Sequence, residues 1–292
     1  MTATTSTTSE PLSDTQPAPP VRPARPLVPA RLDFAGVLAA EWRKLFSLRS
    51  TWWTLGLTVV LLALLALGQA AAIVETLDTP EGAAMMTGVH GAELVTGGYQ
   101  FGMLTIAVLG ALLITGEYST GMIRSTFAAV PTRLPVLAAK ALALSVLTVI
   151  TAAVGFAAAY AVTLPILSEH DLVPSLTDGT TWQIVGGATA FLVAAALFAL
   201  GVGTLLRSTA GAVTVALTVL LLLPGILQFI TLDWVQTLVE YLPLPAAMAF
   251  VTVSDAFGAS GDLTPWQGAA VVAAWALVPM IAAAVVLRRR DA

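Results

Sequence analysis

The stretch WWTLGLTVVLLALLALGQAAA, residues 52–72, decides which class of fold this chain can adopt. It contains no Asp, Glu, Lys or Arg, and it opens with two tryptophans, which favour the boundary between membrane and water. An α-helix needs about 20 mostly apolar residues to cross the hydrocarbon core of a bilayer. The stretch therefore predicts a membrane-spanning helix.

Five further stretches of similar length and composition follow, and only Lys140 places a charged side chain within one of them. A soluble domain carries about a quarter charged residues, whereas this chain has 10% charged and 57% hydrophobic residues. We therefore expect an all-α integral membrane protein with six transmembrane helices. Their expected bounds are 52–72, 97–115, 135–164, 184–206, 211–230 and 266–287.

The chain divides by composition into a tail and one membrane domain. Residues 1–31 are rich in Thr, Ser, Pro and Ala and show no apolar periodicity, which is typical of disordered segments. Residues 32–292 contain all six predicted spans. We expect a disordered cytoplasmic tail followed by a single transmembrane domain.

The basic residues indicate which way the chain threads the membrane. If the N-terminus lies in the cytoplasm, six spans place all 13 Lys and Arg residues on the cytoplasmic side and none in an outer loop. The outer loops then collect acidic residues instead, among them Glu81, Glu93 and Asp178. Because Lys and Arg near the span ends set membrane topology, we expect both termini to be cytoplasmic.

Residues 33–50, just ahead of the first span, have the pattern of an amphipathic helix. Arg43 and Lys44 lie on its polar face. Such a helix is typical of a segment that lies flat in the headgroup region of the inner leaflet. An ordinary flank, whose basic residues only set orientation, is the alternative. The apolar face consists of Phe34, Val37, Leu38, Trp42, Leu45 and Leu48.

Several classes of function are excluded or disfavoured by what the chain lacks. It has no cysteine, so disulfides and thiol catalysis are excluded. Its two histidines, His90 and His170, stand alone in polar loops, which favours solvated side chains over metal ligands. The predicted spans contain no carboxylate or histidine at depth, which argues against an ion-coupled carrier and against an intramembrane enzyme.

The sequence also lacks the G-x-x-x-x-G-K-[ST] loop that cradles nucleotide phosphates. Energy for transport against a gradient would therefore have to come from another polypeptide. We expect no catalytic residue, no metal and no cofactor bound by this chain, and no nucleic-acid partner.

The only sizeable inner loop, residues 116–133, is the candidate contact for such a partner. Its middle can form a short helix with an apolar stripe, which suits docking into a groove of a soluble protein. Glu117 could pair with a basic group on that protein, and Ile123 and Phe127 could serve as apolar anchors. A turn that skims the membrane is the alternative. The candidate site residues are Gly116, Glu117, Tyr118, Gly121, Ile123, Arg124 and Phe127.

Several strings, in their order along the chain, carry a resemblance to a known family. They are Glu41-Trp-Arg-Lys-Leu with Leu48-Arg-Ser-Thr-Trp-Trp53, Gly116-Glu-Tyr-Ser-Thr-Gly-Met-Ile-Arg124, Val130-Pro-Thr-Arg133, Ala138-Ala-Lys140 and Leu287-Arg-Arg-Arg-Asp-Ala292. Together with the six spans, they resemble bacterial ABC-2 type transporter permeases over residues 32–292.

The resemblance implies a transmembrane domain that pairs with a second copy or a paralogue, above two separate ATPase subunits that bind ATP. It implies a bracing role for residues 33–50 and a coupling role for residues 116–133. It also implies short helices that dip toward the membrane within residues 232–265.

The function implied by the resemblance is export of an amphipathic or drug-like substrate across the bacterial cytoplasmic membrane by alternating access. Nothing in the sequence identifies that substrate. A non-transporting scaffold or sensor subunit with the same topology is the alternative.

Overall fold

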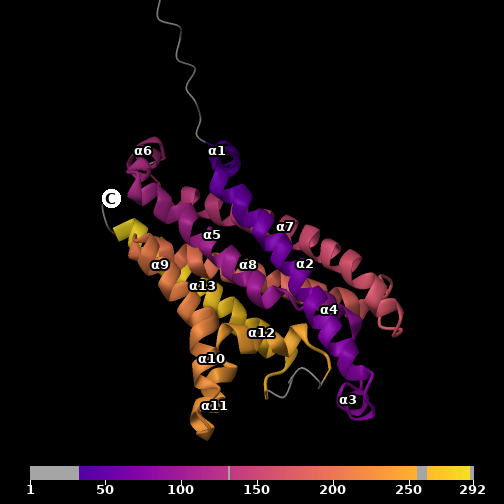
Figure 1. Cartoon of the computed structure of the whole chain (residues 1–292). Helices are drawn as coiled ribbons and strands as arrows, with labels where there is room; N and C mark the ends of the chain where they lie inside the picture. Colours follow the sequence, from indigo (N-terminus) through magenta and orange to yellow (C-terminus); the bar gives the residue numbers. More distant parts are fainter. Residues whose placement is uncertain (1–32, 131, 255–261, 290–292) are drawn as a thin grey trace, which may run out of the picture. The chain divides into compact units, whose positions relative to one another are not determined.

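The computed structural model describes residues 33–130, 132–254 and 262–289. Within these ranges every regular element is a helix and no strand forms, which confirms the predicted all-α fold class (Figure 1). The disorder predicted for residues 1–31 concerns a segment outside the described residues.

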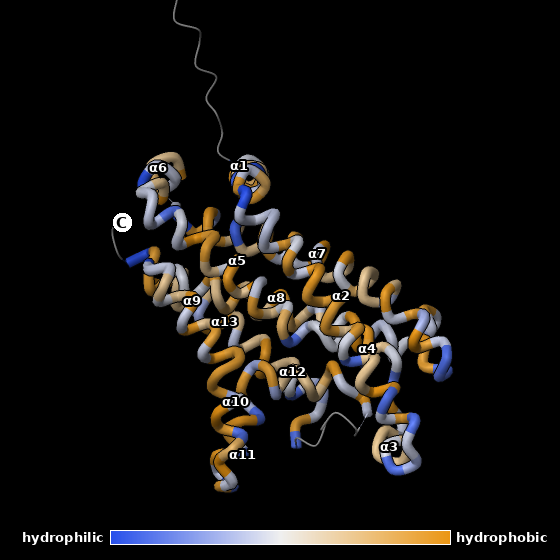
Figure 2. The backbone as a smooth tube through the Cα atoms, viewed as in Figure 1, coloured by the Kyte–Doolittle hydropathy of each residue, from blue (hydrophilic) through white to orange (hydrophobic). Residues whose placement is uncertain are grey.

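Six helical stretches in the described part of the chain are long and apolar enough to cross a bilayer, as the sequence predicts. Hydrophobic residues run along them, and hydrophilic residues concentrate near their ends (Figure 2). The spans are α2 (Arg49–Leu77), α4 (Gly91–Thr96) with α5 (Tyr99–Ser119), α7 (Leu134–Ser168), α8 (Gly179–Leu206), α9 (Thr209–Leu217) continued by η1 (Thr218–Leu222) and α10 (Leu223–Leu227), and α13 (Pro265–Arg289).

Five shorter helices complete the described fold. They are α1 (Phe34–Ser47), α3 (Pro80–Met85), α6 (Met122–Ala129), α11 (Asp233–Glu240) and α12 (Pro243–Val251).

The α8 helix lies at the centre of the bundle and packs against α5, α7, α12 and α13. Large side chains such as Phe191 and Leu192 are fully buried on it. The α5 and α8 backbones come close together at Gly110 of α5, where a Cβ atom would collide with the backbone carbonyl of Ala196. Small residues at such a contact allow two helix backbones to come together within a membrane.

The predicted helix over residues 33–50 is shorter in the structure. Asp33 caps its start by accepting a hydrogen bond from the Gly36 amide at 2.8 Å, and the helix ends at Ser47. Leu48 is extended, with φ −89° and ψ 121°, and α2 begins at Arg49. The break at Leu48 lets the chain turn from α1 into the first span.

The fifth span contains one turn of π-helix, η1, directly before Pro224. Proline has no amide hydrogen and its ring crowds the carbonyl four residues earlier. A wider π turn relieves that crowding and keeps the span continuous.

Two short helices, α11 and α12, form in the described part of residues 232–265, and the expectation that this segment dips toward the membrane stays a prediction. The α12 helix packs against α8 and α13, and its buried residues include Ala246 and Ala247. The indole of Trp275 donates a hydrogen bond to the Tyr241 carbonyl at 2.8 Å, which joins α13 to the link between α11 and α12.

Candidate coupling site at the basic end of the bundle

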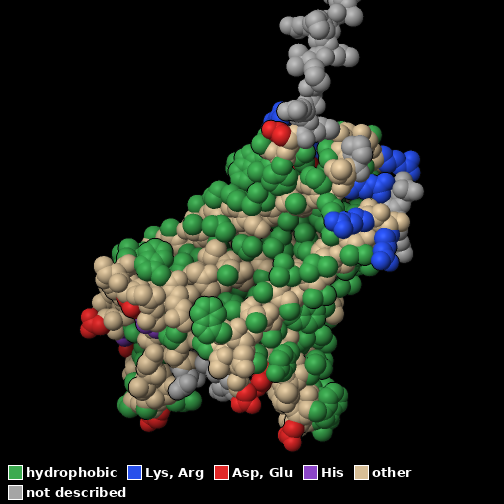
Figure 3. Space-filling model, turned by 180° about the vertical axis from the view of Figure 1, so that it is seen from behind, with side chains coloured by type: hydrophobic (Ala, Val, Ile, Leu, Met, Phe, Trp, Pro, Cys, Tyr) green, Lys and Arg blue, Asp and Glu red, His purple; other side chains and the backbone are tan. Residues whose placement is uncertain are grey.

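The charged side chains separate toward opposite ends of the bundle. On the face shown in Figure 3, Lys and Arg gather at one end, whereas most of the visible Asp and Glu lie at the other. We call these the basic end and the acidic end. The described basic residues are Arg43, Lys44, Arg49, Arg124, Arg133, Lys140, Arg207, Arg288 and Arg289.

The helix ends at the basic end are in direct contact. The Arg133 guanidinium, at the start of α7, donates a hydrogen bond to the Leu287 carbonyl of α13 at 3.3 Å. The guanidinium of Arg207, at the end of α8, lies 5.3 Å from the ring centre of Tyr118 on α5. Together with α1 and α6, these segments form one structured surface at the basic end.

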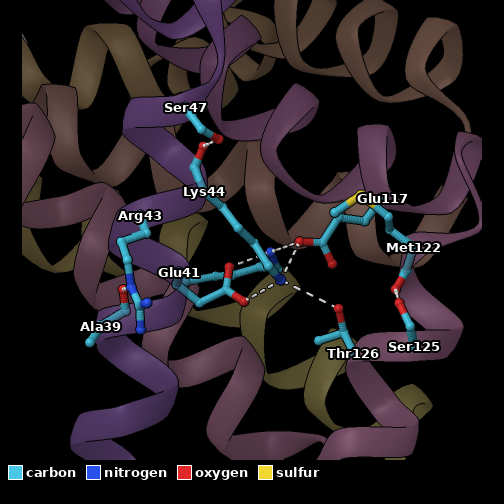
Figure 4. Close-up of polar contacts among 10 residues, drawn as sticks. Ala39, Glu41, Arg43, Lys44, Ser47, Glu117, Met122, Ser125 and Thr126 are labelled. Carbon is cyan, nitrogen blue, oxygen red and sulfur yellow. Dashed lines mark hydrogen bonds and ion pairs between the residues drawn. The ribbon is translucent and has the colours of Figure 1, made fainter. Parts of the chain in front are cut away.

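Four charged residues form a buried ion cluster where α1, α5 and α7 meet. Lys140 Nζ lies 2.6 Å from Glu41 Oε2 and 2.5 Å from Glu117 Oε1. Lys44 Nζ lies 2.8 Å from Glu41 Oε1 and 3.0 Å from Glu117 Oε1 (Figure 4). The ion cluster (Glu41, Lys44, Glu117 and Lys140) therefore alternates two carboxylates with two ammonium groups.

Burial makes this pairing necessary. The Lys140 side chain is 0% exposed and the Glu41 side chain 2%, so neither charge has access to bulk water. Removing charges from water is expensive unless each has a close opposite charge. Burial lowers the pKa of Lys44, but its contacts with Glu41 and Glu117 outweigh that effect and raise the pKa above its usual value.

The ion cluster also reaches the short helix of the inner loop. Lys44 donates a hydrogen bond to the Thr126 hydroxyl of α6 at 3.3 Å. This contact connects α6 to α1, and the cluster connects α1 to α5 and α7. A displacement of α6 would thus act on three other helices.

Glu117 is the candidate site residue that the structure places in the ion cluster. We expected it to pair with a basic group of another protein, and it pairs with Lys44 and Lys140 of its own chain. Its Oε2 atom is buried and has no hydrogen-bond partner among the described residues. Glu41, Lys44 and Lys140 were not recognised as site residues, although a lysine within an apolar span calls for a buried partner.

The predicted short helix in the inner loop is present as α6, but its apolar face points inward. Ile123 is 4% exposed and Phe127 8%, and both belong to the core shared with α1, α5 and α7. The Arg133 guanidinium lies 5.4 Å from the centre of the Phe127 ring. Their own chain therefore covers Ile123 and Phe127, and the anchoring role expected for them stays a prediction.

The outward face of α6 is formed by other residues. Met122 and Arg124 are exposed, as are Ser125, Ala128 and Ala129. The helix starts after Gly121, whose φ of 73° lies in the left-handed region that glycine adopts without strain. Gly116 lies on α5, one turn before the end of that helix.

The predicted apolar face of α1 is divided between protein and surroundings. Leu45 is 1% exposed and packs in the core with Val37, on the same helix face as Glu41. Leu38 and Trp42 are half-buried against that core, whereas Phe34 and Leu48 are exposed. The side of the stripe with Val37 and Leu45 thus packs against the bundle, and only the side with Phe34 and Leu48 is free to face lipid.

The two histidines at the acidic end are partly exposed, and each also faces an aspartate. His90 caps α4 by accepting a hydrogen bond from the Ala92 amide, and its Nε2 lies 3.0 Å from Asp178 Oδ2. His170 Nε2 lies 3.3 Å from Asp78 Oδ1. A hydrogen bond from the Thr180 amide, together with His90, holds the pKa of Asp178 below its usual value.

The fold defines a multi-pass integral membrane protein with a helical loop, α6, between its second and third spans. The family model for ABC-2 family transporter proteins matches residues 35–292, and the chain belongs to that family. It is therefore a permease subunit of an ABC transporter, of the kind that pairs with an ABC ATPase subunit. A comparison with curated proteins finds no match.

Proposed function

We propose that this chain is the permease of an exporter that moves an amphipathic or drug-like substrate out of a bacterial cell by alternating access. Two permease chains, either identical or paralogous, would enclose the pathway, and separate ATPase subunits would bind ATP below them. The basic end would face the cytoplasm, because Lys and Arg near span ends are retained on that side. The charged residues of the described spans lie near the span ends, and the apolar middles support an apolar pathway rather than one for small ions.

The observation that carries this proposal is how α6 is held. Its inner face is packed into the bundle through Ile123 and Phe127, and Thr126 is tied to Lys44 of the ion cluster. Its outer face, with Met122 and Arg124, is exposed. A short helix fixed on one side and free on the other can receive a displacement from an ATPase and pass it to α1, α5 and α7.

Co-purification of the ATPase tests this assignment. We expect Arg124→Glu combined with Met122→Asp to weaken ATPase binding by about 2 kcal/mol, or roughly thirtyfold, because the change places negative charge on the outward face of α6. Arg43→Glu is the matched control, since Arg43 is an exposed basic residue on α1. The amounts of permease in the membrane are compared first.

Retention of the ATPase by the α6 variant at wild-type strength would contradict the coupling role of α6. A non-transporting scaffold or sensor subunit would then become the better description. An equal loss in the Arg43→Glu control would also contradict it, because the effect would then reflect charge at the basic end in general.

A further inference from the structure

A small polar chamber lies at the acidic end, between α2, α4, α5 and α12. Its volume is about 120 Å³, and since a water molecule occupies about 30 Å³, it has room for a small polar group. It is distinct from the ion cluster, which lies at the other end of α5. The polar residues that line the chamber are Gln69, Glu93, Thr96, Tyr99, Gln100 and Thr252.

Glu93 brings a buried negative charge to this chamber. The residue is 4% exposed. Its Oε1 accepts hydrogen bonds from the amides of Val253 and Ser254 at 2.5 and 2.9 Å. Its Oε2 accepts from the Ser254 hydroxyl at 2.6 Å and from the His90 amide at 3.2 Å.

All four of these donors are uncharged, and no ion pair within the described ranges includes Glu93. These donors do not cancel its charge, so the chamber is a favourable place for a cation.

Tyr99 supplies a second and independent sign of a missing ligand. Its side chain is 3% exposed, and its buried hydroxyl lies beside the Gln100 side chain without a hydrogen bond of ordinary geometry among the described residues. Buried hydroxyls are nearly always hydrogen-bonded, so an orphan of this kind calls for an explanation.

Two amides beside Tyr99 complete the chamber wall. Gln69 of α2 and Gln100 of α5 line it, and each carries an amide oxygen that can accept a hydrogen bond. Gly97 makes the room for Gln69, because a Cβ atom there would collide with the Gln69 side chain. The chamber thus offers three neutral oxygens next to a buried carboxylate.

We propose that this chamber binds a primary ammonium group. An ammonium has three N–H donors, which match the oxygens of Tyr99, Gln69 and Gln100, while Glu93 stabilises its charge. A bare metal cation fits less well, because Ca²⁺ and Mg²⁺ need about six oxygen ligands and both Glu93 oxygens already accept two hydrogen bonds each.

The test is binding of radiolabelled methylammonium to the purified permease in lipid nanodiscs. We expect saturable binding of one methylammonium per chain, displaced by unlabelled methylammonium but not by the bulky N-methylglucamine cation. Tyr99→Phe should weaken binding about tenfold, as expected for loss of one hydrogen bond to a charged group. Tyr160→Phe removes a matched hydroxyl outside the chamber and should leave binding unchanged.

Three results would overturn the proposal. The first is no saturable binding to the wild type, and the second is equal loss in Tyr99→Phe and Tyr160→Phe. The third is displacement of labelled methylammonium by Na⁺ at the same concentration as by unlabelled methylammonium. The site would then recognise positive charge and not the N–H donors of an ammonium group. Glu93→Gln, checked by its thermal unfolding temperature, should abolish binding. The measurement needs no ATPase, so its outcome is independent of the proposed coupling role of α6.

Discussion

At the scale of single residues, the basic end is organised around Lys140. Its ammonium lies between two carboxylates that come from α1 and α5, and none of the three groups has useful access to water. A buried ion pair adds little stability over an apolar contact, but removing one partner leaves an uncompensated charge. Replacing Lys140 by an uncharged residue would therefore leave buried carboxylates without enough positive charge beside them.

We predict that Lys140→Met destabilises the protein by about 3–5 kcal/mol, because Glu41 and Glu117 would remain buried with only Lys44 near them. Thermal unfolding of the purified permease in detergent measures the loss. Combining Lys140→Met with Glu117→Gln should restore part of it, since one unpaired charge is removed as well. A double variant that is less stable than Lys140→Met alone would contradict this account.

The pairing within the ion cluster could not be read from the sequence. Glu117 stands out in a family-like string, and Lys140 stands out as the one charge within a predicted span. Glu117 and Lys140 pair with each other across 23 residues, whereas their partners on α1 are 73 and 99 residues away for the pairs Lys44–Glu117 and Glu41–Lys140. Such pairings depend on how α1 crosses α5 and α7, which the pattern of a single helix does not specify.

At the scale of single elements, α1 acts as part of the bundle as well as a flank of the membrane. Leu45 is buried in the protein core, Leu38 is half-buried, and Ser47 is exposed. The helical period predicted the apolar stripe correctly, but it could not distinguish the edge that meets protein from the edge that meets lipid, because both are apolar.

Aspartate substitutions along α1 should therefore have graded effects. We predict that Leu45→Asp causes the largest loss of folded protein, because it buries an unpaired charge, whereas Leu38→Asp causes a smaller one. Ser47→Asp, on the exposed side, should be tolerated. Fluorescence size-exclusion chromatography of the three variants measures the folded fraction. Equal damage from Leu38→Asp and Leu45→Asp would mean that both side chains face the same environment.

The apolar stripe of α6, in the loop between α5 and α7, also has a partner that the sequence pattern did not identify. The sequence correctly predicted a short helix with an apolar stripe, and the structure turns that stripe inward. Periodicity defines a face but not its partner, and an inward-facing stripe is favoured whenever the rest of the chain offers an apolar surface.

We predict that Phe127→Ala destabilises the permease itself, by about 3–5 kcal/mol if the cavity does not collapse. Met122→Ala, on the exposed side of α6, should change the unfolding temperature little. Thermal unfolding of the permease without any ATPase separates the two variants. If Phe127→Ala unfolds at the wild-type temperature, the inward packing of α6 is not a stabilising contact.

At the scale of the whole molecule, the six spans were predictable because the bilayer imposes a length and a composition on each. The structure differs from the predicted spans where contacts between helices, rather than the bilayer, determine the structure. The second span begins early, at Gly91, because His90 and Glu93 cap α4 in the bundle. The chamber lined by Glu93 and Tyr99 was not foreseen, since it forms only where four helices meet.

The separation of charge between the two ends leads to a prediction about topology. We expect cysteines at Glu81 and Thr177, near the acidic end, to react with a membrane-impermeant maleimide in intact cells. Cysteines at Ser125 and Thr132, near the basic end, should react only after the membrane is permeabilised. All four positions are exposed in the structure, so reaction depends on the side of the membrane rather than on burial. The chain has no native cysteine, so the unmodified protein provides a blank.

Labelling at Thr132 in intact cells would place the inner loop and α6 outside, beyond the reach of any cytoplasmic ATPase. It would contradict both the orientation and the coupling proposal, because each requires the basic end to face the cytoplasm. Labelling at Glu81 and Thr177 alone would agree with the rule that Lys and Arg stay on the cytoplasmic side. Since the Lys44–Thr126 hydrogen bond links α6 to the ion cluster of α1, α5 and α7 on that same side, a push from an ATPase would then reach three helices.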